Sequence, residues 1–324
     1  MKLATLDNGT RDGRLILVSR NHSRAVGADG IAPTLQYALE CWDTVETHLL
    51  SLASKLERGE AKDAFDFDAT KACAPLPRAW QWLDGSAYDS HGELMRLATG
   101  RPPPPNDAPL MYQGVSHEFY SGIADFPTPS EANNIDFEGE FGIIVDDVPM
   151  GITAEEAADH IKLIIQINDW SLRGFALRES KIGFGWVQAK PPCSVAPVAI
   201  TPDELGPYWR DGRVDVPLIV DWNGERFGAA QGYDMAWSFP EHVAHAAKTR
   251  SLCAGTIIGS GTVSNTNFRE VGSSCIAERR GIETIDEGKP RTGFMKFGDR
   301  VRMEAKLPDG RPLFGVIDQR VVKG

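Results

Sequence analysis

No run of apolar residues in this sequence approaches the roughly 20 consecutive positions that a membrane-spanning helix needs. The opening stretch MKLATLDNGTRDG lacks the apolar core of a signal peptide, so we expect no export signal there. Clusters of basic residues are also missing, and the formal net charge is −11. Nucleic acids and anionic membranes attract basic surfaces, so we expect neither of them as a partner.

Cysteine is scarce, and its spacing forms no recognisable pattern. The five cysteines are odd in number, dispersed and without CxxC spacing: Cys41, Cys73, Cys193, Cys253 and Cys275. Such a set predicts reduced thiols in a cytoplasmic protein, and it argues against both a disulfide framework and a zinc site.

The composition that remains is that of a globular protein, with 42% hydrophobic and 24% charged residues. A chain of 324 residues is long enough for one large domain and a smaller one. We expect a small N-terminal domain at residues 1–72, because two β-like pieces precede a helical pattern at 34–56. The prolines of APLPRAW then mark the start of a larger domain at residues 73–324.

Strand signals dominate the larger domain. Period-two alternation predicts strands at 194–200, 215–222, 256–264 and 299–306. The tract RPPPPND at 101–107 suits neither a helix nor a central strand, so we expect an extended surface loop.

Two helices are predicted in this domain. Thr153 and Glu156 form a capping box, and an apolar stripe between residues 157 and 165 predicts a helix over 153–167. A second helix is predicted to begin at Ser238, with Pro240 in its first turn and Glu241 completing another capping box.

The stretch FEGEFGIIVDD at 137–147 places two acidic residues at the mouth of an apolar strand. Glu138 and Glu140 are two apart, so their side chains point to the same face. At about 5 Å and an effective dielectric of about 20, their repulsion is on the order of 3 kcal/mol. A shared divalent cation with oxygen ligands, Mg²⁺, Mn²⁺ or Ca²⁺, explains the pair. The alternative is a solvated strand end, where such a pair costs little.

Two further stretches carry acidic or titratable residues in suitable settings. In INDWSLRGF, Asp169 follows a buried apolar run, although Asn168 and Asp169 equally suit a simple turn. In WLDGSAYDSH, Asp84 stands next to a glycine and His91 follows seven residues later. For an isolated histidine in such a turn, a structural hydrogen bond is the alternative.

Taken together, these stretches resemble the fumarylacetoacetate hydrolase family over residues 75–324. The matching motifs are DGSAYDSH, DFEGEFGIIVDDVP, NDWSLRGF, the lysine of QAKPPCSVAPV, and IIGSGTVSN, in this order. Residues 1–70 carry none of these motifs and resemble only the small N-terminal domain of some members. The resemblance implies a β-rich α+β fold, a mixed β-sandwich roll preceded by a small N-terminal domain that contains β-strands.

The resemblance also implies a divalent cation, Mg²⁺ or else Ca²⁺ or Mn²⁺, at the mouth of this roll. Glu138 and Glu140 match the family's paired strand ligands, and Asp169 matches the aspartate of its N-D-x-S motif. Asp84 matches a further aspartate ligand of the fumarylacetoacetase branch.

Three residues match the family's acid–base and leaving-group machinery. His91 matches the general base that takes a proton from water, a role that suits imidazole. Glu278, in CIAERRG, is the best placed acid to orient that histidine, after allowing for a short insertion. Lys190 matches the lysine that steadies the leaving carbanion or a substrate carboxylate; the alternative is a surface lysine before a turn.

Three more residues match groups that bind the substrate. Arg173 matches the family's substrate arginine, whose fork suits a carboxylate. Tyr112 matches a pocket tyrosine and Thr262 the threonine of G-S-G-T, although GSGT alone equally suits a tight turn. The sequence departs from the fumarylacetoacetase branch at Ala176 and Ser86, where that branch has glutamine and tyrosine, so the substrate itself stays open.

The expected activity is therefore metal-dependent hydrolysis of a carbon–carbon bond in a small anionic diketo acid such as fumarylacetoacetate. Such an acid would arise from the breakdown of an aromatic compound. One alternative is a keto-acid decarboxylase, or an isomerase or hydratase of a keto-dienoate, with the same metal and enolate chemistry. An alternative of another class is a metal-stabilised domain that binds a ligand without catalysis. The resemblance also implies a homodimer.

Overall fold

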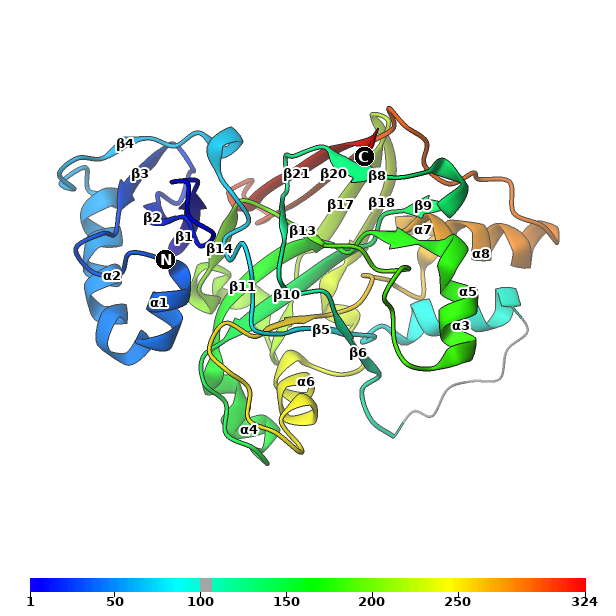
Figure 1. Cartoon of the computed structure of the whole chain (residues 1–324), viewed down its shortest axis with the longest axis horizontal. Coiled ribbons are helices and arrows are strands. Elements are labelled where there is room, and N and C mark those ends of the chain that lie inside the picture. Colours follow the sequence, from blue (N-terminus) through cyan, green and yellow to red (C-terminus); the bar gives the residue numbers. More distant parts are fainter. Residues whose placement is uncertain (100–106) are drawn as a thin grey trace.

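The structure of the protein is a computed structural model that describes residues 1–99 and 107–324. The extended loop was predicted over residues 101–107, and positions 101–106 of it lie outside the described residues. Two β-sheets form the body of the molecule, and helices cover its two ends (Figure 1).

The larger sheet has the strand order β4-β3-β2-β1-β14-β11-β10-β19-β5-β6, and β13 joins it through β11 while β7 pairs with β13. Its strands are β1 (Lys2–Leu6), β2 (Arg14–Val18), β3 (Arg24–Gly27), β4 (Phe65–Asp66), β5 (Trp82–Gly85), β6 (Met111–Gly114), β7 (Tyr120–Ser121), β10 (Gly139–Val145), β11 (Ile161–Asn168), β13 (Ser194–Val195), β14 (Val198–Ile200) and β19 (Ile257–Gly259). Because β1 pairs with β14, the N-terminal strands extend the sheet of the larger domain.

The second sheet has the order β18-β17-β20-β21-β8. Its strands are β8 (Phe126–Thr128), β17 (Pro217–Trp222), β18 (Glu225–Gln231), β20 (Arg300–Lys306) and β21 (Pro312–Lys323). The sheets pack through apolar side chains, as Phe141 of β10 and Phe314 of β21 show, with ring centroids 5.9 Å apart. Burying one such side chain stabilises the fold by about 1.5–3 kcal/mol, so this layer is a main source of stability.

The remaining strands form two short pairs, β9 (Ile135–Asp136) with β12 (Ser171–Leu172) and β15 (Trp209–Arg210) with β16 (Arg213–Val214). The α-helices are α1 (Leu35–Glu40), α2 (Trp42–Glu57), α3 (Asp89–Thr99), α4 (Ala154–Ala157), α5 (Arg173–Ile182), α6 (Phe239–Ala246), α7 (Phe268–Val271) and α8 (Ile276–Glu287). Short 3₁₀ turns are η1 (Ala69–Lys71), η2 (Glu131–Asn133), η3 (Ala158–His160), η4 (Pro202–Glu204), η5 (Gly206–Tyr208) and η6 (Gly232–Asp234).

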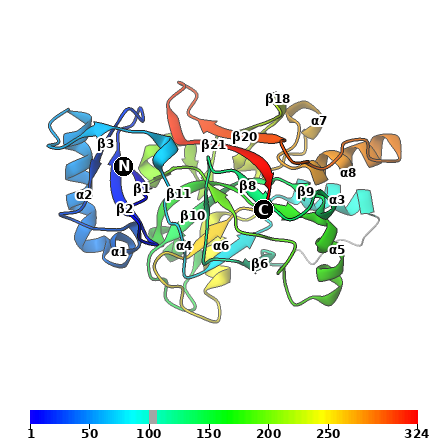
Figure 2. The ribbon, with the colours of Figure 1, turned by 45° about the horizontal axis from the view of Figure 1, so that its top comes forward.

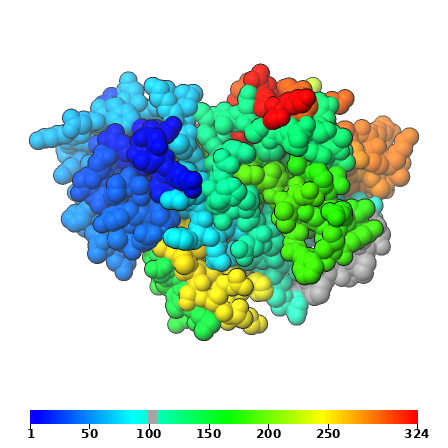
Figure 3. Space-filling view, in the orientation of Figure 1, coloured from blue at the N-terminus to red at the C-terminus, as the bar shows by residue number. Residues whose placement is uncertain are grey.

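The N-terminal part has its own apolar core. Leu35, Leu39 and Leu49 of α1 and α2 are buried against Leu15 and Leu17 of β2. The predicted helical pattern at 34–56 is therefore confirmed, as two helices that meet at Cys41. Figure 3 shows this part as one end of the molecule, coloured blue. The mixed α+β fold with an N-terminal domain is confirmed, and the boundary at residue 72 stays a prediction.

The helix predicted over 153–167 is wrong beyond its first turn. Thr153 and Glu156 do form the capping box, but α4 ends at Ala157 and residues 161–168 form strand β11. Leu163, Ile165 and Ile167 belong to the core under α1 and α2, whereas Ile161 and Ile164 belong to the core between the sheets. Lys162, Gln166 and Asn168 alternate with apolar residues along β11, but Ile164 interrupts this alternation. Together with Ile161 and Ile165, Ile164 fits the spacing of a helical stripe.

The other predicted elements are confirmed, with shorter bounds in two cases. Helix α6 begins after Ser238 with the expected capping box, and β17 and β20 lie where strands were predicted. The strand at 194–200 is interrupted before Pro197, which has no N–H for a central ladder. The strand at 256–264 ends at Gly259, because Gly261 adopts a positive φ of 76°.

Helices α3, α5 and α8 gather at the end of the molecule away from the N-terminal strands, in both ribbon views (Figures 1 and 2). Helices α3 and α8 pack directly against each other. Within residues 1–99 and 107–324, no helix combines the length and apolar character needed to cross a membrane.

Candidate functional site: a buried carboxylate cluster

The register of the larger sheet places three candidate residues side by side. Asp84 of β5 lies opposite Tyr112 of the neighbouring strand β6 and opposite Gly259 of β19 on the other side. Strand β10, which carries Glu140, is the next neighbour of β19. Gly259, which has no side chain, therefore lies between Asp84 and the strand that carries Glu140.

Gly259 creates the space in which these carboxylates lie. A Cβ atom at this position would stand 2.5 Å from Asp84 Oδ1 and 3.0 Å from Glu140 Oε2. It would also stand 2.4 Å from the ring of Trp82. Since real Cβ contacts are longer than this, only glycine allows both oxygens to approach the backbone of β19.

Asp169 completes a group of three acidic residues. Asp84, Glu140 and Asp169 each offer an oxygen, and these oxygens all lie within 4.8 Å of one another. Asp84 is 4% exposed, and the other two residues are fully buried. Asp169 follows the end of β11, and its backbone N–H donates to the carbonyl of Glu138 at 2.9 Å. The group is thus built from the ends of three strands and lies away from solvent.

Burial and mutual repulsion disfavour the charges of this group. Burial raises the pKa of Asp84 well above its usual range, and the charge of Asp169 raises it further. Burial likewise raises the pKa of Glu140, with added repulsion from Asp84 and Asp169. Among the described residues, no N–H or O–H group donates to either oxygen of Glu140. Buried carboxyl groups without donors are stabilised either by protonation or by a nearby positive charge.

These features fit a divalent cation. The ligand atoms are all carboxylate oxygens, which hard cations such as Mg²⁺, Mn²⁺ and Ca²⁺ prefer. A cation among them would replace the missing donors of Glu140 and offset the repulsion within the group.

Glu138 lies beside this group but faces two basic side chains. Its Oε1 accepts a hydrogen bond from Nη2 of Arg173, and its Oε2 accepts one from Nζ of Lys190. Burial raises the pKa of Glu138, but Arg173 and Lys190 outweigh this effect and lower the pKa to about 2. The two glutamates predicted to share one cation therefore have different neighbours: Glu140 faces acids, and Glu138 faces bases.

Lys190 connects Glu138 to the acidic group. Its Nζ also donates to Asp169 Oδ2 at 2.6 Å, and the hydroxyl of Tyr112 donates to the same oxygen at 2.7 Å. Burial alone would lower the pKa of Lys190, but the negative charges of Asp169 and Glu138 outweigh this effect and raise the pKa above its usual value. The ammonium therefore stays protonated. Lys190 is thus a largely buried cation, with 11% of its side chain exposed, and the alternative of a surface lysine is excluded.

The loop before Lys190 is held by one carboxylate. Glu179 of α5 accepts hydrogen bonds from the backbone N–H groups of Val187, Gln188 and Ala189 at 3.1, 2.8 and 2.9 Å. This clamp fixes the backbone immediately before Lys190.

His91 lies in the first turn of α3, with its Nδ1 3.6 Å from Oε1 of Glu278 on α8. Glu278 is fully buried, and its Oε1 accepts a hydrogen bond from the hydroxyl of Ser264. Neither His91 Nδ1 nor Glu278 Oε2 has a hydrogen-bond partner among the described residues. The packing of α3 on α8 therefore brings together the predicted base and the predicted acid.

Thr262 is buried in the turn after β19. The preceding residue, Gly261, donates its N–H to Asp84 Oδ1 at 3.2 Å. The G-S-G-T segment therefore continues from the end of β19 and contacts the acidic group through Gly261.

Sequence reasoning missed three residues near the site. Cys193 is buried and its thiol donates to Asp169 Oδ1 at 2.9 Å, while Ser264 contacts Glu278 as described above. Asp136 is fully buried and pairs with Arg173, its Oδ2 lying 2.9 Å from Nε. The sequence held a signal for Asp136, because D-x-E-x-E continues the period-two pattern of the glutamates. Cys193 and Ser264 carried no such signal.

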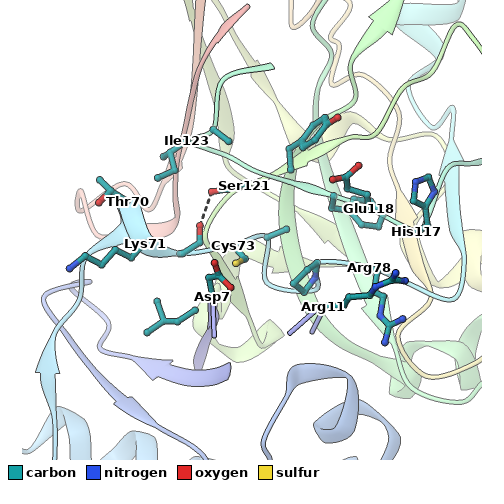
Figure 4. Close-up of a pocket in the computed structure, with 17 residues that line it drawn as sticks. Asp7, Arg11, Thr70, Lys71, Cys73, Arg78, His117, Glu118, Ser121 and Ile123 are labelled. Atoms are coloured by element: carbon teal, nitrogen blue, oxygen red, sulfur yellow. Dashed lines mark hydrogen bonds between the residues drawn. The ribbon is translucent and has the colours of Figure 1, made fainter. Parts of the chain in front are cut away.

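A pocket of about 1010 Å³ lies elsewhere, between the N-terminal part and residues 117–124 (Figure 4). Its walls mix basic side chains, such as Arg11 and Lys71, with acidic ones, such as Asp7 and Glu118. None of the candidate site residues lines it. The carboxylate cluster therefore defines the candidate site, and this pocket does not.

Replacing Gly259 with alanine should disrupt the carboxylate group. The added methyl group displaces Asp84 and Glu140, and overpacking of this kind costs about 1–3 kcal/mol of stability. We expect at least about tenfold weaker Mn²⁺ binding by calorimetry, since disturbing the surroundings of a metal site typically costs 10–100-fold. Gly293→Ala is the control, because a Cβ there meets nothing within 4 Å. Unchanged Mn²⁺ affinity in Gly259→Ala would exclude this cluster as the metal site.

Comparison with known proteins places this geometry in a family. The family model for the fumarylacetoacetate (FAA) hydrolase C-terminal region matches residues 81–322, and that for fumarylacetoacetase N-terminal domain 2 matches residues 1–78. Fumarylacetoacetase of Caenorhabditis elegans is 25% identical over 209 residues, covering 56% of this chain and 50% of the relative. The oxaloacetate tautomerase YisK of Bacillus subtilis is 28% identical over 204 residues, covering 62% of this chain and 64% of the relative.

The matched segments thus span between half and two thirds of those relatives. Among solved structures, maleylpyruvate hydrolase from Sphingobium sp. SYK-6, in complex with manganese(II) and pyruvate, matches with a TM-score of 0.65 and 16% identity, covering both chains completely. That likeness shows a shared fold. The family models cover the carboxylate cluster and nearly all of the chain, so this protein belongs to the fumarylacetoacetate hydrolase family.

Proposed function

We propose that this protein is a divalent-metal-dependent hydrolase that cleaves a carbon–carbon bond in a diketo acid such as fumarylacetoacetate. The products are two smaller acids. The observation that carries the proposal is the position of three buried carboxylates, of which Glu140 has no donor among the described residues, beside two largely buried cations, Lys190 and Arg173. One part of this site suits a metal ion, and the adjacent part suits an anionic substrate.

In this proposal, Asp84, Glu140 and Asp169 hold the cation. Glu138 joins them, because an ionised carboxylate has about four lone-pair sites and its bonds to Lys190 and Arg173 leave some free. When bound, Mg²⁺, Mn²⁺ or Ca²⁺ supplies Lewis acidity that polarises a carbonyl and stabilises an enolate.

His91 acts as the general base in this proposal. Its Nδ1 faces Glu278, so Nε2 is the atom left to accept a proton from water. The water oxygen then bonds to the substrate carbonyl carbon, the adjacent carbon–carbon bond breaks, and its electron pair leaves as an enolate. Glu278 stabilises the imidazolium that forms, as a carboxylate beside a catalytic histidine does in general.

The basic side chains orient the substrate and the leaving group. The Lys190 ammonium, which donates a hydrogen bond to Asp169, is proposed to supply positive charge to the leaving enolate. Arg173 offers a planar fork suited to a substrate carboxylate. Tyr112 and Thr262 are proposed to add neutral hydrogen bonds to the same acid.

Tautomerisation of a keto acid is the second candidate, because one relative is an oxaloacetate tautomerase. The two reactions share an enolate and differ in whether water attacks a carbonyl carbon. Incubating the protein and Mg²⁺ with a panel of diketo acids, and identifying products by NMR, separates them. Two new carboxylic acids support hydrolysis; proton exchange at the α-carbon without cleavage supports tautomerisation.

We further propose that the protein is cytoplasmic and works as a homodimer, as the family resemblance implies. Sedimentation at micromolar concentration should then give twice the 35.4 kDa mass of one chain. A single species at the monomer mass would contradict this expectation.

A further inference from the structure

Asp136 makes a set of contacts that links the two halves of the site. It belongs to β9, which pairs with β12 so that Asp136 lies opposite Ser171, two residues before Arg173. The chain continues from Asp136 to Glu138, whose backbone bridges to Cys275 at the start of α8. Asp136 therefore lies between the helix that begins with Arg173 and the helix that carries Glu278.

Three donors converge on the Asp136 carboxylate. Its Oδ1 accepts the backbone N–H of Ile276 at 2.7 Å, and its Oδ2 accepts that of Ala277 at 2.9 Å. Its Oδ2 also accepts Nε–H of Arg173 at 2.9 Å. A negative side chain at the start of α8 is favourable, because the first backbone N–H groups of a helix have no acceptor within the helix.

Arg173 is held at two points by two carboxylates. Nε donates to Asp136, whereas Nη2 donates to Glu138. Two contacts on a planar guanidinium fix both its position and its plane. If Glu138 also binds a metal ion or a substrate, its bond to Arg173 weakens, and Asp136 is the contact that keeps the guanidinium of Arg173 in place.

The same carboxylate accepts the first two backbone N–H groups of α8. Ile276 and Ala277 immediately precede Glu278, and Glu278 lies beside His91. Asp136 thus fixes the spacing between the arginine and the histidine–glutamate pair.

We propose that Asp136 is a positioning residue that aligns Arg173 with the start of α8, so that substrate carboxylate and catalytic histidine are held in one geometry. This inference rests on the proposed function, because it assigns Arg173 to a substrate carboxylate. Asp136 itself touches neither substrate nor metal, and it acts through Arg173 and α8.

The test measures pyruvate binding by calorimetry in the presence of saturating Mn²⁺, using the full chain. Asparagine at position 136 keeps the size of the side chain but offers only one acceptor oxygen to three donors. We expect Asp136→Asn to weaken pyruvate binding at least about tenfold, as loss of a hydrogen bond to a charged group does. Its Mn²⁺ affinity should stay within about threefold, since Asp136 is outside the cluster of Asp84, Glu140 and Asp169.

A double-mutant cycle separates this role from a general loss of structure. Arg173→Lys keeps the charge but not the fork, so adding Asp136→Asn to it should weaken pyruvate binding by no more than about threefold. Glu283→Gln is the matched control: Glu283 is on the same helix and accepts two backbone N–H groups, from Arg291 and Thr292, yet contacts no candidate site residue. It should leave pyruvate binding unchanged.

The inference is overturned if Asp136→Asn affects pyruvate no more than Glu283→Gln, or equally with and without Arg173→Lys. Wild-type protein that binds Mn²⁺ but not pyruvate would overturn this inference, whereas the proposed function is tested separately by the products from the panel of diketo acids. Should Asp136→Asn fail to fold, ¹⁵N NMR of wild-type protein decides: the Arg173 Nε–H signal, assigned by its loss in Arg173→Lys, should exchange with solvent more slowly than those of surface arginines. Equally fast exchange would overturn the inference.

Discussion

Replacing His91 with alanine should lower kcat about a hundredfold or more, within the usual range for removal of a general base. The reason is that no other imidazole faces Glu278 among the described residues, so the proton of the attacking water has no acceptor. Affinity for the metal should stay nearly unchanged, because His91 is not among the proposed ligands, which are Asp84, Glu140 and Asp169 together with Glu138. Steady-state kinetics and Mn²⁺ calorimetry on the same preparation measure both quantities.

The control for this substitution is His48→Ala, at an exposed position on α2 in the N-terminal part. It should change neither kcat nor metal affinity. Loss of Mn²⁺ binding in His91→Ala would show that His91 is a ligand. Unchanged turnover would show that another group is the base, and would favour the reaction without attack by water.

Glu140→Gln should abolish metal-dependent activity and yet stabilise the metal-free protein. Groups that only surround metal ligands typically contribute 10–100-fold to affinity, so loss of a ligand oxygen should cost about a hundredfold or more. Without metal, however, Glu140 is a buried acid with two oxygens that lack donors. Its neutral isostere removes that unfavourable charge, so the free energy of unfolding of the metal-free variant should exceed that of metal-free wild type at neutral pH.

The pH dependence has a definite sign. Burial and neighbouring acids raise the folded-state pKa of Glu140 above its usual 4.5. A raised carboxyl pKa gives stability that is present below the unfolded value and is lost as pH rises through the folded one. Metal-free wild type should therefore lose stability as pH rises above about 4.5, more steeply than Glu140→Gln.

Thermal unfolding in chelator and in excess Mg²⁺ tests both parts of this prediction. A ligand at 100 times its Kd stabilises the folded state by about 2.7 kcal/mol; wild type should show such an increase and Glu140→Gln should not. Glu155→Gln, at an exposed position on α4, is the control and should behave as wild type. Full activity of wild type after exhaustive chelation would contradict the metal dependence.

The local sequence pattern predicted the acidic residues of the cluster. It could not predict that Glu140 faces other acids whereas Glu138 faces Arg173 and Lys190. Alternation places Glu138 and Glu140 on one side of a strand, and it says nothing about what lies across from each. That information comes from strand register, which sets Asp84 opposite Gly259 and only one strand away from β10, which carries Glu140. Long-range pairing of this kind has no signature in a short stretch of sequence.

The wrong prediction of a helix over residues 161–167 also reflects long-range packing that a short stretch of sequence does not show. Residues 161–168 are buried on both faces, one against the N-terminal helices and one against the second sheet. Lys162, Gln166 and Asn168 lie on one face of this strand, but Ile164 on the same face interrupts the alternation, so the sequence shows no clear period of two. The capping box at Thr153 was a reliable local signal, because its hydrogen bonds involve only neighbouring residues.

A crystal structure with Mn²⁺ and pyruvate, with data collected at the manganese absorption edge, tests the central claim most directly. The account predicts one anomalous peak at about 2.0–2.6 Å from oxygens of Asp84, Glu140 and Asp169, the range of divalent cations with oxygen ligands. It also predicts that the pyruvate carboxylate contacts Arg173 and that His91 stays outside the coordination sphere. A peak in the pocket of Figure 4, or a peak that His91 coordinates, would contradict the account.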